Sequence, residues 1–243
     1  QRQEAPASPM KEVALSLTPT AGQGFTGHPG LSLSGDGDQW SVAAKIKKIV
    51  QHSEHHYSIF SLDVDRQIEI EASVAIDPNT DVLSISSKVS NLHSSPITIN
   101  YCAAATLPIT SQFQHIIGFD GHWAGEFHTH EQSLHFGSYV RENRRGRTSH
   151  DAFPGLIMRS KATTELVGEA FGFHLGWSGN HKILAEKMAD GRAYVQLGEL
   201  LLPGEIQLAH GESYTSPVLY ACYSDQGLSG LSQQYHRYVR QQL

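Results

Sequence analysis

The stretch FGFHLGWSGNHK, residues 171–182, carries large apolar side chains at every second position. Because alternate side chains of a strand point to opposite faces, the apolar residues from Phe171 to Trp177 share one face. The opposite face holds only two glycines and a histidine, which leaves room for another backbone layer to approach closely. The Ser-Gly-Asn that follows is typical of a turn. We therefore expect a strand with Trp177 in the protein interior, a second sheet packed on its bare face, and a hairpin after it.

The same alternation dominates the rest of the chain. Apolar residues alternate with polar ones over 68–76, resume after the Asp-Pro-Asn-Thr turn at 77–80, and recur over 97–101. Residues 66–106 therefore predict a three-stranded antiparallel meander. Similar patterns predict strands near 40–50, 56–63, 113–117, 122–130, 134–140, 165–177, 182–188, 192–202, 205–209 and 214–222.

Only the C-terminal segment departs from this alternation. Asp225 is a candidate helix N-cap. The apolar residues that follow it form one helical stripe, which runs on to Leu243: Leu228, Leu231, Tyr235 and Tyr238. We expect an all-β protein, a two-layer β-sandwich closed by one C-terminal helix, with no internal repeat and no domain boundary.

Composition excludes several classes of protein. The net charge is −6, and acidic and basic residues are mixed along the chain. This balance gives no electrostatic footprint for nucleic acid or for an anionic membrane. No apolar run approaches the roughly 18 residues of a membrane-spanning helix. We therefore expect neither nucleic acid nor a membrane as a partner.

The N-terminus and the cysteines bear on processing and location. Residues 1–12 are polar and lack the apolar segment of a signal peptide, so residues 1–21 are expected to be a leader or the truncated start of the domain. Cys102 and Cys222 both lie within apolar alternation, where reduced core thiols are usually found. A reducing compartment, the cytoplasm, is the expected location.

The chain has 15 histidines, and the densest group comprises His122, His128, His130 and His135. On a strand, His128 and His130 would point to one face as metal ligands do, and Glu126 or Glu131 could add a carboxylate. The spacing does not match a cupin motif, because no glutamate follows His130 where that motif places one. Exposed or hydrogen-bonded strand histidines are therefore favoured, and a cupin-like metal enzyme remains an alternative.

A glycine-rich segment, residues 24–40, contains none of the phosphate-loop patterns. It could be an irregular connection, or a loop that carries His28 or Trp40 away from the sandwich toward a ligand. His28 lies between Gly27 and Pro29 with no apolar alternation around it, so a core position does not explain it. The basic run at 141–147 is isolated in an acidic protein and predicts a solvated loop.

Five ordered motifs together resemble the N-terminal domain of glycoside hydrolase family 36 α-galactosidases. They are GHW at 121–123 with Glu126, RRGRTSHDAFP at 144–154, GFHLGWSGNHK at 172–182, LLPGE at 201–205 and YACYSDQGLSGLSQQYHRYVR at 220–240. The resemblance implies a β-supersandwich of the galactose-mutarotase-like kind over residues 22–243. It also implies that a (β/α)₈ barrel follows, carrying both carboxylates of a retaining mechanism.

The resemblance assigns no catalytic residue, metal or cofactor to this chain. Many relatives carry Trp-x-Arg-Glu where this chain has Trp123 to Glu126, and here Gly125 replaces the arginine. Trp123 is the stronger candidate, since an indole can stack on a sugar ring and donate a hydrogen bond. Relatives use sandwich loops to complete the galactose subsite. His28 and Trp123 are therefore the expected substrate-binding residues.

Three functional hypotheses follow. The chain could be the non-catalytic domain of a retaining α-galactosidase that shapes the active-site rim and supports a homo-oligomer. Its partners would then be α-galactoside sugars and the catalytic barrel. It could instead be a free-standing carbohydrate-binding or mutarotase-like protein, or a cupin-like enzyme built on His128 and His130.

Overall fold

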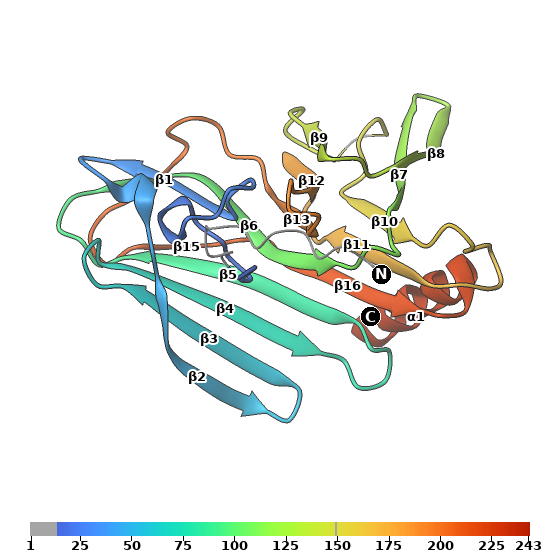
Figure 1. Ribbon diagram of the computed structural model, residues 1–243, viewed down its shortest axis with the longest axis horizontal. Helices are drawn as coiled ribbons and strands as arrows, with labels where there is room; N and C mark the ends of the chain where they lie inside the picture. Colours follow the sequence, from blue (N-terminus) through green and yellow to red (C-terminus); the bar gives the residue numbers. More distant parts are fainter. Residues whose placement is uncertain (1–13, 149) are drawn as a thin grey trace, which may run out of the picture.

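The computed structural model describes residues 14–148 and 150–243, which fold into two antiparallel β-sheets and one α-helix (Figure 1). The larger sheet has the order β2-β3-β4-β5-β16-β11-β10-β7-β8, with β15 also paired to β5. Its strands are β2 (Lys45–Ser53), β3 (His56–Asp63), β4 (Ile68–Ile76), β5 (Leu83–Asn91), β7 (His115–His122), β8 (Gly125–Ser133), β10 (Gly155–Arg159), β11 (Ala170–Leu175), β15 (Ser213–Thr215) and β16 (Leu219–Ser224).

The smaller sheet has the order β1-β6-β13-β12-β9, with β14 also paired to β6. Its strands are β1 (Leu31–Gly35), β6 (Ile97–Ile109), β9 (Gly137–Asn143), β12 (His181–Lys187), β13 (Ala193–Glu199) and β14 (Ile206–Leu208). The helices are the short 3₁₀ turns η1 (Ala21–Gln23) and η2 (Gln39–Ser41), and α1 (Gly227–Gln242). The predicted fold class, an all-β sandwich with a C-terminal helix, is confirmed. No helix among the described residues is both long and apolar enough to cross a membrane.

The main core lies between the two sheets. Leu156, Met158 and Leu175 contribute from the larger sheet, and Ile183 and Leu197 contribute from the smaller one. All five side chains are almost fully buried. Burying a side chain of this size contributes about 1.5–3 kcal/mol, so this contact holds the two layers together.

The stretch at 171–182 folds partly as predicted. The predicted hairpin was wrong, because β11 and β12 belong to different sheets and residues 178–180 connect them. Phe173 and Leu175 on β11 face the core. The strand ends at Leu175, however, because the Trp177 backbone N–H donates to the Leu175 carbonyl oxygen (2.8 Å) in a tight turn. Trp177 is 38% exposed, and its Nε1–H donates to the Asn180 carbonyl oxygen (3.1 Å). The prediction that Trp177 fills the interior was wrong, since the turn carries it out of the strand's alternation.

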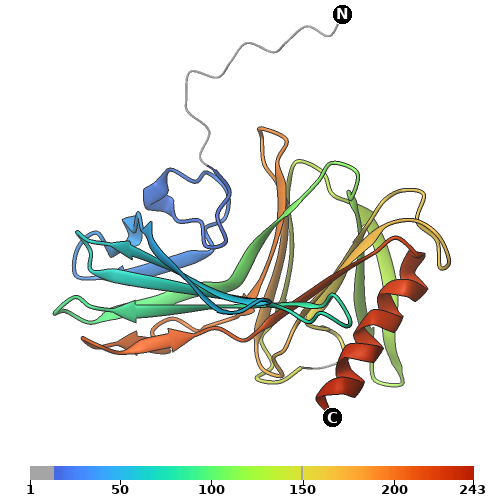
Figure 2. The ribbon, with the colours of Figure 1, turned by 90° about the horizontal axis from the view of Figure 1, so that it is seen from below.

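Helix α1 covers the bare face of β11, where we predicted a second sheet. A Cβ atom on Gly172 would lie 2.8 Å from the Tyr235 ring of α1, so only glycine lets the helix dock this closely. The predicted stripe packs against the sheet, and the Tyr235 hydroxyl donates to the Tyr220 carbonyl oxygen (3.1 Å). Figure 2 shows α1 lying across the strands. Asp225 is not the N-cap, because the helix begins at Gly227 after Gln226.

The predicted meander at 66–106 is half correct. β4 and β5 form the expected hairpin, but β6 leaves for the smaller sheet and pairs with β1, β13 and β14. The consecutive meander is instead β2-β3-β4-β5. Alternation shows which side chains are buried but not which sheet a strand joins, because either sheet could bury the same face of β6.

Two strands were not predicted, and several predicted strands differ in extent from the observed ones. β1 lies inside the glycine-rich segment, and β10 begins at Gly155 directly after Pro154. The strand expected at 165–177 begins only at residue 170, and the one expected at 214–222 is divided into β15 and β16. The leader expected at 1–21 lies, up to residue 13, outside the described residues.

Candidate functional site

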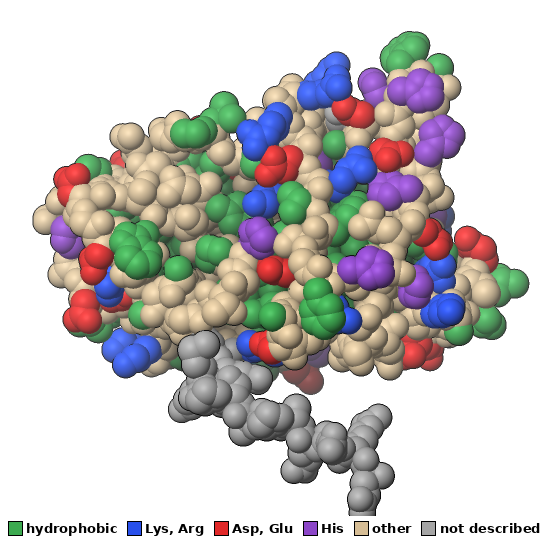
Figure 3. Space-filling model, turned by 45° about the horizontal axis from the view of Figure 1, so that its top comes forward, with side chains coloured by type: hydrophobic (Ala, Val, Ile, Leu, Met, Phe, Trp, Pro, Cys, Tyr) green, Lys and Arg blue, Asp and Glu red, His purple; other side chains and the backbone are tan. Residues whose placement is uncertain are grey.

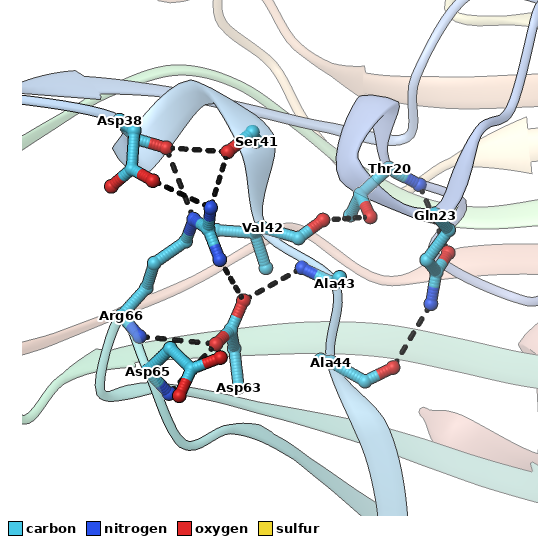
Figure 4. Close-up of polar contacts among 10 residues, drawn as sticks. All are labelled: Thr20, Gln23, Asp38, Ser41, Val42, Ala43, Ala44, Asp63, Asp65 and Arg66. Atoms are coloured by element: carbon cyan, nitrogen blue, oxygen red, sulfur yellow. Dashed lines mark hydrogen bonds and ion pairs between the residues drawn. The ribbon is translucent and has the colours of Figure 1, made fainter.

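The glycine-rich segment is anchored at its start by η1. The Thr20 hydroxyl donates to the Val42 carbonyl oxygen, and Gln23 Nε2 donates to the Ala44 carbonyl oxygen (3.0 Å), as Figure 4 shows. The Gln23 side chain also accepts the Thr20 backbone N–H (3.2 Å), in the manner of a capping box. These bonds tie the start of the segment to the residues just before β2.

The end of the segment is anchored by an arginine on the β3–β4 turn. The Arg66 guanidinium donates to the Asp38 carboxylate (2.6 Å), the Ser41 hydroxyl (2.6 Å) and the Asp63 carboxylate (3.4 Å), as Figure 4 shows. Asp63 is buried and accepts the backbone N–H of Ala43 (2.7 Å). Burial raises the pKa of Asp63, but the backbone donors Ala43 and Arg66 and the Arg66 charge outweigh it and hold the pKa below its ordinary value.

The middle of the segment is held by the backbone of His28. Its N–H donates to Glu186 Oε2 on β12 (2.9 Å). Its carbonyl oxygen accepts Tyr194 Oη (3.3 Å) and Gln196 Nε2 (3.0 Å), both on β13. A glycine-rich loop fixed in this way presents its side chain in one orientation, so the expectation of a loop that displays His28 is compatible with the geometry.

The imidazole of His28 is oriented by a carboxylate. Nδ1 lies 2.9 Å from Glu186 Oε2 and 3.4 Å from the Ser138 hydroxyl, and the side chain is 46% exposed. Burial raises the pKa of Glu186, but the His28 N–H, the Tyr194 hydroxyl and the His28 ring outweigh it, so the pKa is lowered and the carboxylate stays ionised. Nδ1 must then carry the proton.

In the neutral imidazole, this arrangement leaves Nε2 of His28 as a hydrogen-bond acceptor. No described residue is bonded to Nε2. An acceptor fixed in direction and open to solvent can receive a hydrogen bond from a hydroxyl group, which is the group that sugars offer. Sequence reasoning missed Glu186, Tyr194 and Gln196, because nothing in the local pattern connects residues about 160 positions away to His28.

Trp123 lies at a different place, on the turn between β7 and β8, which extends beyond the body of the sheet in Figure 1. It is 80% exposed. The next residue, Ala124, has a left-handed backbone (φ 60°), and its N–H donates to Glu126 Oε1 (3.1 Å). The structure records no contact between Trp123 and His28, so it does not join the two predicted binding residues into one site. Trp40, on η2, is also largely exposed.

The predicted histidine cluster does not assemble. His130 Nε2 lies 3.3 Å from the Tyr139 hydroxyl, and His130 Nδ1 lies 3.1 Å from Asp120 Oδ2. The rings of His122 and His128 stack with centroids 6.5 Å apart. Within 14–148 and 150–243, no three His, Cys, Asp or Glu side chains gather where they could hold a metal ion. The cupin-like hypothesis therefore has no support in this part of the chain.

Three arginines of the basic run at 141–147 pair with carboxylates, and Arg141 does so with Asp120 (3.4 Å). Arg144 pairs with Glu142 (2.7 Å), and Arg145 pairs with Asp151 (2.7 Å). Figure 3 shows acidic and basic side chains interspersed on the face that it presents. The predicted solvated loop is correct only for residues 144–147, which are exposed, because residues 141–143 are the end of strand β9. The mixed charges provide no continuous basic patch for nucleic acid on that face.

Both cysteines are buried free thiols, as predicted. Burial raises the pKa of Cys102 to about 12 and that of Cys222 to about 12. Thiols with such values are protonated at neutral pH and are poor nucleophiles. Neither cysteine is therefore a candidate catalytic residue.

Comparison with known proteins shows the family. The glycosyl hydrolase family 36 N-terminal domain matches residues 1–209, and the chain belongs to this family. Over 194 residues the chain is 39% identical to an α-galactosidase of Escherichia coli. The aligned region covers 80% of this chain and 27% of that protein. Over 178 residues it is 33% identical to the bifunctional α-galactosidase/sucrose kinase AgaSK of Mediterraneibacter gnavus, with 73% and 19% covered.

Solved structures agree with the fold. The galactosidase domain of AgaSK matches with a TM-score of 0.82 at 27% identity, over 90% of this chain and 33% of that chain. The α-galactosidase AgaA of Geobacillus stearothermophilus matches with a TM-score of 0.83 at 23% identity, over 91% and 33%. These likenesses confirm the sandwich fold that the motifs implied. The chain spans about a quarter or less of the length of the two curated relatives.

Proposed function

We propose that this chain is the non-catalytic N-terminal domain of a retaining α-galactosidase, an enzyme that hydrolyses terminal α-galactosides. The family match over residues 1–209, together with 39% identity to the Escherichia coli α-galactosidase, carries this proposal. The matched region is 27% of that relative, so the relative has ample length for a catalytic region outside it. A retaining mechanism needs two carboxyl groups about 5–5.5 Å apart, and in this proposal the catalytic barrel supplies both.

In this function the domain shapes the active-site rim and supports a homo-oligomer. The anchored His28 is the best candidate at the rim, since Glu186 keeps its free Nε2 ready to accept a sugar hydroxyl. Trp123 offers an exposed indole that can stack on a sugar ring. In this proposal the loop that carries His28 reaches the active-site mouth of the same subunit or of a neighbouring one. The two buried thiols support a cytoplasmic location.

Steady-state kinetics of His28→Ala in the full-length enzyme test whether His28 binds substrate at the active-site rim. Losing one hydrogen bond of about 1 kcal/mol corresponds to a roughly fivefold lower kcat/KM. His55→Ala is the matched control, because this histidine is similarly exposed (42%) on the β2–β3 turn. We expect His28→Ala to lower kcat/KM with an unchanged melting temperature, and His55→Ala to change neither. Equal kinetics for both variants would remove His28 from the site.

A second variant tests how His28 is positioned. Glu186→Gln removes the charge that fixes the proton on Nδ1 and retains much of the side-chain shape. We expect ¹⁵N NMR spectra to show the Nδ1–H tautomer of His28 in the parent and a mixture of tautomers in this variant. Loss of kcat/KM should accompany the mixture. A free-standing carbohydrate-binding protein would instead be indicated by a natural gene product that ends near residue 243.

A further inference from the structure

An apolar groove of about 570 Å³ crosses the outer face of the larger sheet. Its floor is formed by β10 and β11, including Ile157, Gly172 and His174. Helix α1 forms one wall, and the β7–β8 hairpin forms the other. The groove is separate from the His28 region. It lies on the larger sheet, whereas His28 is held by Glu186 and Tyr194 of the smaller sheet.

The wall opposite α1 is aromatic. Phe119, Phe127 and Phe153 contact one another, with ring centroids 4.8 to 5.5 Å apart. Phe127 has a left-handed backbone (φ 63°), which costs a bulky residue about 1–3 kcal/mol. It is nevertheless 58% exposed, so neither burial nor backbone preference within this domain explains its conformation. Across the groove, Val239 of α1 is also more than half exposed.

The floor carries an imidazole without a described hydrogen-bond partner. His174 packs its ring against Phe153, with centroids 5.1 Å apart. Burial lowers the pKa of His174, and the neighbouring His181 lowers it further, so the ring is neutral at pH 7. His174 is half-buried, and a neutral imidazole that lines the groove without a hydrogen bond has one donor and one acceptor to offer a group that enters it.

We infer that this groove is the seat of the polypeptide that follows residue 243 in the full-length enzyme. Helix α1 is both the wall of the groove and the last element of the chain, so any continuation starts beside it. The chain covers only 27% of the Escherichia coli relative, so such a continuation has the length to fill the groove. The surface of that polypeptide which fills the groove presents apolar side chains to the three phenylalanines and one polar group to His174.

The inference rests on the proposed function only for the existence of a catalytic region after α1. Native-state cysteine labelling of the full-length enzyme tests it, with peptide mapping to identify each modified site. Val239→Cys reports on the groove, and Ile49→Cys, on the exposed strand β2, is the control. Cys102 and Cys222 are buried and contribute little background from this domain. We expect Ile49→Cys to react at least tenfold faster than Val239→Cys.

Two results would overturn the inference. Equal labelling rates would show that the groove stays open. Protection of Val239→Cys that disappears on dilution would show that a second copy covers it, since contact within one polypeptide does not depend on concentration. An enzyme that hydrolyses α-galactosides but labels both positions equally retains the proposed function and loses this inference.

A charge in the groove provides an independent variant. Phe127→Asp should expose Val239→Cys to the reagent in the full-length enzyme, because the seated surface would have to bury a carboxylate. Phe136→Asp is the control, since Phe136 is also exposed and lies outside the groove, where Lys187 Nζ is 4.8 Å from the centroid of its ring. It should leave the labelling of Val239→Cys unchanged. Identical labelling in the two variants would count against the inference.

Discussion

At the scale of single residues, carboxylates decide the course of the glycine-rich segment. Asp63 fixes Arg66, which binds the end of the segment, and Glu186 fixes both the backbone and the ring of His28. Each is an acceptor for several donors at once, so each remains ionised. The flexibility expected of a glycine-rich loop is therefore removed by a few polar contacts.

Asp63→Asn should destabilise the domain in a pH-dependent way. The folded-state pKa of Asp63 lies below its ordinary value of 3.8, so the carboxylate stabilises the fold above that value and the effect is lost as the pH falls through the folded pKa. We expect a loss of about 1–3 kcal/mol at pH 7, the scale for hydrogen bonds to a buried charge. Urea denaturation at pH 7 and below 3.8 measures it. The exposed Asp36→Asn should behave like the parent at both values.

The turn at Trp177 lowers the loss of unfolding free energy that we expect for Trp177→Ala. A fully buried indole, as the alternation predicts, would lose about 3–5 kcal/mol on truncation. Because Trp177 is partly exposed and keeps one hydrogen bond to Asn180, we expect a loss of about 1–2 kcal/mol. The shift of the urea midpoint measures this loss. A loss of about 3–5 kcal/mol would instead mean that Trp177 is buried in solution.

At the scale of elements, the glycine on β11 lets the helix dock. The Cβ of Gly172→Ala would meet the Tyr235 ring at 2.8 Å, so the ring and helix must shift. Overpacking of this kind costs about 1–3 kcal/mol. Tyr235→Ala removes the obstacle, and a double-mutant cycle should show that Gly172→Ala costs less in that background. Additive losses would show that the clash does not limit docking.

Strand assignment shows where local reasoning ends at this scale. The β4–β5 hairpin is predictable because its turn chemistry and its alternation agree. The crossing of β6 is not, since its buried residues satisfy either sheet. The short strands β1 and β10 were missed because glycine and proline nearby are typical of loops.

At the scale of the whole molecule, this chain by itself should not hydrolyse an aryl α-galactoside. The proposed function places both catalytic carboxylates in the region that follows, and without that pair no glycosyl-enzyme intermediate forms. Release of the aryl group should equal that of a heat-treated control. Turnover clearly above the control would show that the chain contains its own catalytic site.

The candidate site could be predicted only in part. His28 was found because it lies among glycines and a proline with no apolar pattern around it, and Trp123 because of the motif that contains it. The partners of His28 could not be found, since strands β12 and β13 lie far from it in the sequence and reach it only through the pairing of the smaller sheet. The groove was also invisible, because α1 and the β7–β8 hairpin form its walls from distant parts of the chain.

The sequence alone determined the alternating strands, the C-terminal helix, the buried thiols and the family. These are properties of side-chain order, since periodicity fixes which face is apolar and ordered motifs identify relatives. The tertiary structure decided which sheet β6 joins, which layer covers Gly172, whether Trp177 is buried, and which carboxylate holds His28. The burial of Trp177 depends on a tight turn that alternation does not reveal. The others depend on contacts between residues whose proximity is created by folding, and one strand's pattern is compatible with several such partners.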